Sequence, residues 1–259
     1  MKYGLPKPDF VEECTRILEA LSRPENRNLP LRLMGALAFR LHCSQFGHLQ
    51  DRLGRVFTDF DFAAYRHAKT AIMRFFSDLG YEEDRWVSRL FGDQRLVYHD
   101  QVHGRHVDVF FDHLRFSHTI PLRGRLEVDW PTIPLAELFL EKTQIVRLNE
   151  KDIVDVLMLL REHPVGDSDT ETINLEIVAK RCSQDWGLWY TVNLNIDRIR
   201  QYLRSHPLLT EDRAIIEERL DQIRSALIAW PKTLRWRIRG LIGARWRWYE
   251  EVEELRDRF

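Results

Sequence analysis

Apolar positions in the first half of the chain switch between helical and strand spacing. Apolar residues recur every three to four positions from Pro8 to Ser22, which predicts an amphipathic helix. Short, β-prone apolar runs predict strands over residues 31–34, 58–65, 86–90, 94–99 and 105–111. Further helices are predicted over residues 36–46 and 66–79. Helices combined with an antiparallel or mixed sheet indicate an α+β fold.

After Pro134 the strand pattern stops and helical spacing takes over. Helices are predicted over residues 135–146, 150–163 and 173–259. The polar run Pro164 to Thr170 is typical of a linker. We therefore predict two domains, residues 1–163 with the sheet and residues 171–259 as a helical carboxyl-terminal domain.

Composition narrows the function classes. Of the 259 residues 44% are hydrophobic, enough for a substantial core, and the net charge of −1 gives no overall attraction to nucleic acid or membrane. No apolar signal segment and no apolar run of about 18 residues is present, so we expect a cytoplasmic protein without a membrane partner. Three widely spaced cysteines argue against a disulfide framework or a zinc knuckle.

Two aspartates one residue apart are the strongest chemical signal. Asp59 and Asp61 fall in the strand predicted over residues 58–65, so they share a face at a spacing of roughly 6.5 to 7 Å. Paired carboxylates are costly to bury unless a cation compensates them, and Mg²⁺ prefers such oxygen ligands. The alternative is a solvated strand end with two ordinary acids.

A third carboxylate completes a familiar arrangement. Asp108 lies in the strand predicted over residues 105–111, which can lie beside the strand that carries Asp59 and Asp61. A glycine turn at Gly35, a helix and these two acidic strands resemble the polymerase-β-like nucleotidyltransferase superfamily. The resemblance implies a nucleotidyltransferase-type mixed sheet flanked by helices. It also implies that three acids hold two Mg²⁺ or Mn²⁺ ions, which in turn hold a nucleoside triphosphate.

Two further runs resemble one branch of that superfamily, the abortive-infection type IV toxin nucleotidyltransferases. The first runs from Arg55 to Phe62, and the second combines Leu135 to Lys142, Arg147 and Lys151 to Leu160. The resemblance covers about residues 30 to 162. It implies a toxin–antitoxin setting with an antitoxin-like protein partner.

The resemblance assigns roles to individual residues. The implied catalytic set is Asp59, Asp61, Asp108, Lys142 and Asp152, with the first three as metal ligands and Asp108 as general base. The implied nucleotide-binding set is Gly35, Ala36, Arg55, Thr58, Lys142 and Asp155. The two helical acids share a helix face and could orient Lys142 or Arg55 by charge pairing. The competing interpretations are a surface lysine at 142 and a surface Arg55 paired with Asp51.

One position departs from the family pattern. The family usually has glycine or serine after the turn glycine, whereas this chain has Ala36. Alanine offers no hydroxyl to a phosphate oxygen, although the backbone N–H groups at a helix start still can bind one.

The expected function is Mg²⁺-dependent transfer of a nucleoside monophosphate from a nucleoside triphosphate to a hydroxyl acceptor, with release of pyrophosphate. Transfer RNA and protein are candidate acceptors. The alternative is a catalytically weak member that serves as a nucleic-acid or protein-binding module.

The arginine- and tryptophan-rich run from Leu234 to Tyr249 bears on the acceptor. Such a run can hold an RNA backbone and stack bases. The alternative is a terminal helix that packs Trp236, Ile238, Leu241, Ile242 and Trp246 inward. The five histidines between His99 and His118 are scattered by a strand-turn-strand pattern, and we expect no dedicated histidine site among them.

Overall fold

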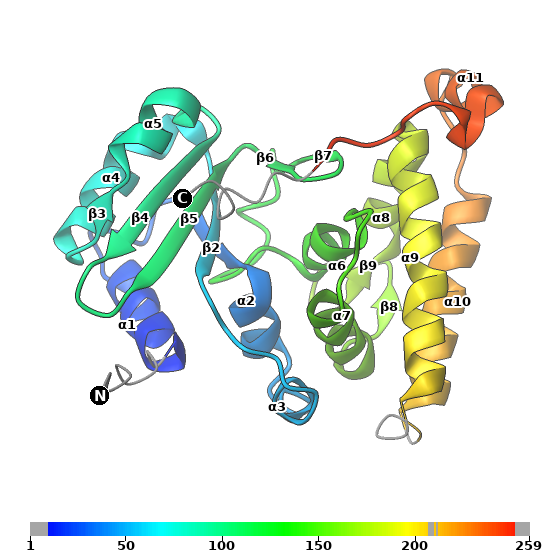
Figure 1. Ribbon diagram of the computed structural model, residues 1–259, viewed down its shortest axis with the longest axis horizontal. Coiled ribbons are helices and arrows are strands. Elements are labelled where there is room, and N and C mark those ends of the chain that lie inside the picture. The colour runs from blue at the N-terminus through cyan, green and yellow to red at the C-terminus, as the bar shows by residue number, and fades with distance from the viewer. Residues whose placement is uncertain (1–9, 207–209, 211, 252–259) are drawn as a thin grey trace, which may run out of the picture. The chain divides into compact units, whose positions relative to one another are not determined.

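The computed structural model of the chain describes residues 10–206, 210 and 212–251 (Figure 1). It contains two compact units. The sheet unit comprises Met1–Ala38, Val56–His113 and Leu122–Ile133, and the helical unit comprises Phe39–Arg55, Leu114–Pro121 and Pro134–Phe259. The chain is α+β, as expected. The predicted division into a domain of residues 1–163 and a helical domain of residues 171–259 stays a prediction.

A mixed five-stranded sheet organises the sheet unit. Its order is β1 (Leu31–Met34), β2 (Phe60–Ala64), β5 (Arg105–Phe111), β4 (Arg95–Asp100) and β3 (Glu82–Glu83). β2 and β5 are parallel, and the other neighbouring strands are antiparallel. β1 and β5 have the predicted bounds, whereas β2 is shorter than predicted and begins after Asp59.

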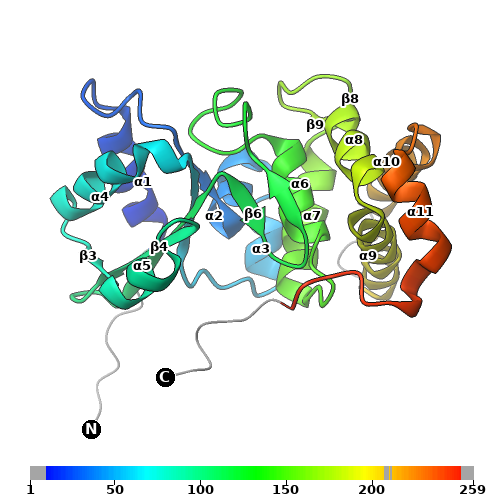
Figure 2. The same cartoon turned by 90° about the horizontal axis from the view of Figure 1, so that it is seen from above.

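One face of this sheet forms the apolar core of the unit. Phe60 and Phe62 alternate with Asp61, so they point to the opposite face from it. The Phe60 ring lies 5.2 Å from Phe10 of α1 (Phe10–Ser22), and the Phe62 ring lies 5.7 Å from Phe76 of α4 (Lys69–Asp78). Figure 2 shows α1 and α4 together on one side of the sheet. Asp61 therefore lies on the opposite face of the sheet, which α1 and α4 do not cover.

The ends of the helices on this face differ little from the prediction. The start predicted at Pro8 and Asp9 lies outside the described residues, and a 3₁₀ turn, η1 (Arg66–Ala68), precedes α4.

The strand predicted over residues 86–90 is wrong. These residues form α5 (Arg85–Phe91), because the carboxylate of Asp84 accepts hydrogen bonds from the N–H groups of Trp86 and Val87. Such an N-cap fixes a helix start and outweighs local strand propensity.

The helical unit is built around two helices with few exposed positions. Every residue of α6 (Leu135–Thr143) is buried, as is the stretch from Asp152 to Leu160 of α7 (Glu150–Glu162). Around them lie α3 (His48–Arg52), α8 (Leu175–Gln184), α9 (Trp186–Ser205) and α10 (Arg213–Ala229), and α11 (Leu234–Ile242) contacts α8 and α9. Figure 1 shows α9 and α10 running side by side. The charged residues within these two buried stretches are consequently enclosed: Glu137, Glu141, Lys142, Asp152 and Asp155.

Four short strands lie outside the five-stranded sheet. β6 (His113–Arg115) and β7 (Thr119–Pro121) form one pair. β8 (Val165–Gly166) pairs in parallel with β9 (Ile173–Asn174). The prediction that no strand follows Pro134 is therefore wrong, because the run read as a linker begins with β8. α2 (Gly35–His42) starts in the sheet unit and ends in the helical unit.

No helix among the described residues has the length and apolar character needed to cross a bilayer.

The aromatic run at α11 is not a core face, so its predicted inward packing is wrong. The side chains of Ile238, Leu241 and Trp246 are 56%, 85% and 71% exposed. Trp236 is half-buried, with its ring edge-on to Trp189 at 5.3 Å.

All three cysteines are buried and unpaired. Cys14 lies in the sheet unit, and burial raises the pKa of its thiol to about 12. Cys43 and Cys182 lie in the helical unit, and burial raises the pKa of each thiol above its ordinary value.

A buried carboxylate anchors α1 in the sheet unit. Glu13 accepts hydrogen bonds from Arg16 at 2.6 and 2.8 Å and from the Tyr81 hydroxyl at 2.7 Å. It also pairs with Arg105 of β5 at 3.1 Å. Burial acts to raise the pKa of Glu13, but the bonds from Arg16 and Tyr81 outweigh it, and the pKa lies below its usual value.

We expect Glu13→Gln to lower the free energy of unfolding by about 2 kcal/mol at pH 7, because charge-assisted bonds are lost. A depressed pKa in the folded state means that this stabilisation is present above the ordinary carboxyl pKa. It is lost as pH falls through the lower folded pKa. The difference between wild type and variant should therefore shrink from pH 6 to pH 3 in urea unfolding. Glu19 is an exposed glutamate of the same helix, so Glu19→Gln should change neither the free energy of unfolding at pH 7 nor its dependence on pH.

Candidate functional site

Asp61 and Asp108 are direct neighbours across two parallel strands. The register of β2 and β5 pairs Asp61 with Asp108, so the two strands are adjacent as expected. Adjacent strands lie about 4.8 Å apart, and paired residues point to the same face. Asp61 is half-buried and Asp108 is buried, with 8% of its surface exposed. Two acids are thereby held side by side on the face opposite Phe60 and Phe62.

Asp59 occupies a different kind of position. It lies just before β2, so the alternation of a strand does not fix its direction. Its carboxylate accepts a hydrogen bond of 2.9 Å from the hydroxyl of Thr58. Both residues are half-buried. Thr58 thus orients Asp59 locally.

The three aspartates do not form a tight ligand group. Among the described residues, the three side chains whose ligand atoms lie within 4.8 Å of one another are His42, His163 and Glu171, not these aspartates. Metal binding by Asp59, Asp61 and Asp108 therefore stays a prediction. Carboxylate oxygens are nevertheless the donor set that Mg²⁺ and Mn²⁺ prefer, and these residues fit such an ion by chemistry.

Arg95, which no sequence pattern indicated, contacts the carboxylate of Asp108. Arg95 of β4 pairs with Oδ1 of Asp108 through Nε at 2.9 Å and Nη2 at 2.7 Å. Its guanidinium also lies 5.1 Å from the centre of the Phe110 ring. The register pairs Asp108 with Val97, so Arg95 reaches it diagonally from two residues away. This cation offsets the charge that a metal ion would otherwise compensate.

Gly35 brings the start of α2 against Asp61. Its φ of +69° lies in the left-handed region, and a Cβ built on it would be only 2.4 Å from Oδ2 of Asp61. Both facts require glycine here. Ala36 follows directly, so the N–H groups of the helix start lie next to a candidate metal ligand.

We expect Gly35→Ala to lower the free energy of unfolding by about 2 kcal/mol or more, since it adds a clash to an unfavourable backbone angle. Gly80→Ala separates the two effects. Gly80 has a φ of +87° in the same unit, with nothing within 4 Å of its added Cβ. Urea unfolding should show a clearly smaller loss for Gly80→Ala. Equal losses would mean that the contact with Asp61 is unimportant.

The second group of site residues lies in the helical unit. Lys142 of α6 is 7% exposed, so its interpretation as a surface lysine is wrong. Its ammonium lies 3.0 Å from Glu141, 3.2 Å from Asp152 and 3.9 Å from Asp155. The expected pairing of the two α7 acids with Lys142 is present. Glu141, adjacent in sequence, adds a partner that the motif did not indicate.

Arg55 joins the same cluster. Its guanidinium lies 3.3 Å from Asp155, to which Gln50 also donates a hydrogen bond of 2.8 Å. The interpretation that pairs Arg55 with Asp51 is wrong, because Asp51 contacts Arg40 at 3.0 Å. Burial raises the pKa of Asp155, and the charges of Lys142 and Arg55 oppose that rise.

The two groups differ in chemistry. Asp59, Asp61 and Asp108 offer oxygen atoms to a cation, whereas Lys142 and Arg55 offer positive charge, enclosed by three carboxylates. Comparisons with protein-family models, with curated proteins and with solved structures gave no match. Any assignment of function therefore depends on these residues.

Proposed function

We propose that the chain is a Mg²⁺-dependent nucleotidyltransferase of the polymerase-β-like type, related to the abortive-infection toxins. It transfers a nucleoside monophosphate from a nucleoside triphosphate to a hydroxyl acceptor and releases pyrophosphate. The observation that supports this most directly is the register pair Asp61–Asp108 on parallel strands, with Gly35 closing the turn beside Asp61.

In this proposal Asp59, Asp61 and Asp108 hold the metal, which can be Mg²⁺ or Mn²⁺. When bound, the metal neutralises the triphosphate and promotes in-line displacement. Asp108 accepts the proton of the acceptor hydroxyl, and Thr58 keeps Asp59 oriented. The N–H groups that begin α2, at Gly35 and Ala36, bind phosphate oxygen.

The charge cluster of the helical unit has a supporting role in the proposal. The resemblance assigns Lys142 to nucleotide phosphate; within the helical unit Asp152 and Asp155 orient its ammonium, and Asp155 also orients Arg55. A compact ammonium suits phosphate oxygens. The proposal requires the positive charge of Lys142 to be shared between the nucleotide and the carboxylates of Glu141, Asp152 and Asp155.

RNA is the acceptor that the surface of the helical unit favours. Arg245, Trp246 and Arg247 are exposed, and exposed arginine and tryptophan side chains can contact phosphates and stack on bases. The proposal includes a cytoplasmic location and an antitoxin-like protein partner. Transfer to RNA should weaken steeply with salt, because each neutralised phosphate releases counterions.

A second candidate function is a binding module that keeps the fold without chemistry. The ion pair between Arg95 and Asp108 favours it, because the guanidinium already compensates the third acid. Ala36 in place of a hydroxyl residue favours it as well.

The purified chain should be incubated with each nucleoside triphosphate labelled at the α-phosphate, with Mg²⁺ or Mn²⁺. Bulk transfer RNA and a protein lysate serve as separate acceptor pools. We expect metal-dependent label in one pool, with equimolar pyrophosphate. Binding of nucleotide or RNA without any label transfer would favour the binding module.

A further inference from the structure

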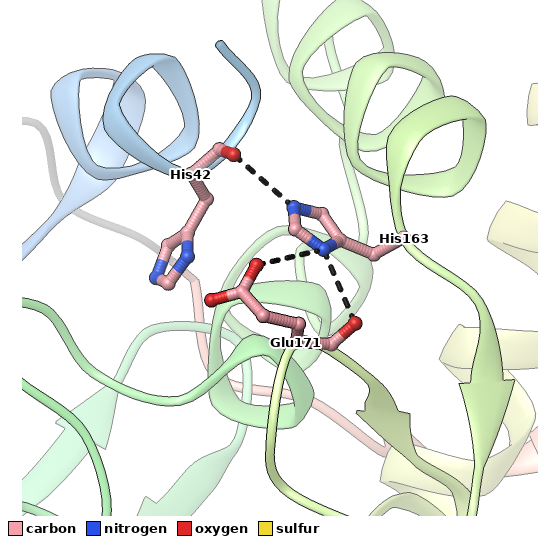
Figure 3. A group of neighbouring side chains, drawn as sticks. All are labelled: His42, His163 and Glu171. Carbon is pink, nitrogen blue, oxygen red and sulfur yellow. Dashed lines mark hydrogen bonds and ion pairs between the residues drawn. The ribbon is translucent and has the colours of Figure 1, made fainter. Parts of the chain in front are cut away.

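We propose that His42, His163 and Glu171 form a binding site for one divalent transition-metal ion of the zinc class. The site lies in the helical unit and does not depend on the proposed transfer reaction. Each side chain contributes one ligand atom, and these three atoms lie within 4.8 Å of one another. Figure 3 shows the carboxylate of Glu171 pointing toward the space between the two imidazole rings.

The donor set selects the metal. Two imidazole nitrogens and one carboxylate oxygen suit Zn²⁺ and its neighbours, whereas Mg²⁺ takes oxygen ligands almost exclusively. Ligand atoms of a tetrahedral site with bonds of about 2.0 to 2.2 Å are roughly 3.4 Å apart. Nδ1 of His163 and Oε2 of Glu171 are 3.4 Å apart. Because Glu171 is exposed, water can supply the fourth ligand.

The surroundings of His163 match those of a metal ligand. Its ring is buried, and Nε2 lies 3.3 Å from the backbone oxygen of His42. A ligating histidine usually donates its other N–H group to a carbonyl or carboxylate, which fixes the tautomer. With Nε2 as that donor, the lone pair of Nδ1 faces the cluster.

Contacts within the helical unit hold the ligands in place before any metal binds. The carboxylate of Glu162 accepts hydrogen bonds from the N–H groups of Gln45 and Phe46, at 2.9 to 3.2 Å. The guanidinium of Arg161 lies 4.0 Å from the centre of the Phe46 ring. The turn after His42 is thus fastened to the end of α7, directly beside His163. Preorganised ligands reduce the cost of binding.

The third ligand comes from a loop with an unusual backbone. Ile173 donates a hydrogen bond of 2.9 Å to the backbone oxygen of Pro164, which closes the loop that carries Glu171. Glu171 has a φ of +47°, an angle uncommon for a residue other than glycine. Such angles persist where surrounding contacts impose them and are frequent at ligand sites.

An ion pair is the competing explanation. Nδ1 of His163 also lies 3.3 Å from the backbone oxygen of Glu171, an arrangement in which Nδ1 would donate a hydrogen bond rather than bind a metal. The group would then be an ion pair between His163 and Glu171 that binds no metal. The two explanations differ in the response to added Zn²⁺, which stabilises the chain only if the group binds metal.

The test uses the full chain after treatment with EDTA and dialysis. We expect one Co²⁺ per chain to give the visible absorption of a tetrahedral site, and Zn²⁺ to displace it. At about 100 times its dissociation constant, Zn²⁺ should raise the unfolding temperature by roughly 5 to 10 °C. Mg²⁺ should give no absorption change and should not displace Co²⁺.

Variants locate the site. His42→Gln and Glu171→Gln should each weaken Zn²⁺ binding at least tenfold. His48→Gln and Asp167→Asn are matched controls at exposed positions of the helical unit, and both should bind like wild type. The proposal is overturned if no Co²⁺ band appears, or if the two ligand variants bind Zn²⁺ as wild type does. It is equally overturned if Glu171→Gln lowers the unfolding temperature while Zn²⁺ leaves that of wild type unchanged, since this is the ion-pair result.

Discussion

Replacing Asp61 with asparagine should reduce metal-dependent nucleotidyl transfer by about 10³-fold or more while leaving the fold intact. Asparagine has nearly the same shape, so it keeps the place beside Gly35 and opposite Asp108. It removes the negative charge on which metal binding depends. Phosphoryl-transfer catalysis is mostly electrostatic and positional, so the loss should fall on the rate constant.

The measurement is the initial rate of label transfer at saturating nucleotide, with unfolding curves recorded for each protein. Asp78→Asn is the matched control, since Asp78 is an exposed aspartate of the sheet unit at the end of α4. It should transfer at the wild-type rate. An Asp61→Asn protein with full activity would exclude Asp61 as a metal ligand in catalysis.

Replacing Lys142 with methionine should lower the free energy of unfolding by about 3 to 5 kcal/mol. Methionine fills similar space but removes the ammonium that lies 3.2 Å from the buried carboxylate of Asp152 and 3.9 Å from that of Asp155. An uncompensated buried charge costs far more than the original pair contributes. Lys142 therefore acts on stability whether or not it binds nucleotide.

Urea unfolding at pH 7 measures this effect, with Lys151→Met as control because Lys151 is exposed at the start of α7. The double variant Lys142→Met with Asp152→Asn should recover part of the loss, because it removes one unpaired charge. If Lys142→Met were as stable as Lys151→Met, the carboxylates would have to find other compensation. The role of Lys142 would then be limited to binding.

The sheet could largely be predicted because its signals are local. β1 and β5 were located from apolar runs whose alternation is visible within seven residues. α5 was missed because the cap from Asp84 decided between two weak propensities. The resemblance over residues 135–160 indicated Lys142, Asp152 and Asp155, and the fold brings these three side chains together.

The remaining contacts depend on chain folding over long distances. His42 and His163 are separated by 121 residues along the chain, and neither belongs to a spaced motif. The histidines between His99 and His118, where we expect no dedicated site, give no signal for this pair either. Arg95 was missed for a related reason, since its contact with Asp108 depends on the exact register of β4 against β5.

The three buried cysteines make the two units distinguishable in a single chemical experiment. A buried thiol with a raised pKa reacts with an alkylating reagent only when its surroundings open. Cys14 reports on the sheet unit, and Cys43 and Cys182 report on the helical unit. Mass spectrometry of alkylated peptides over time would then read the opening of each unit separately. The native chain thus carries its own site-resolved probes of local unfolding, without any engineered label.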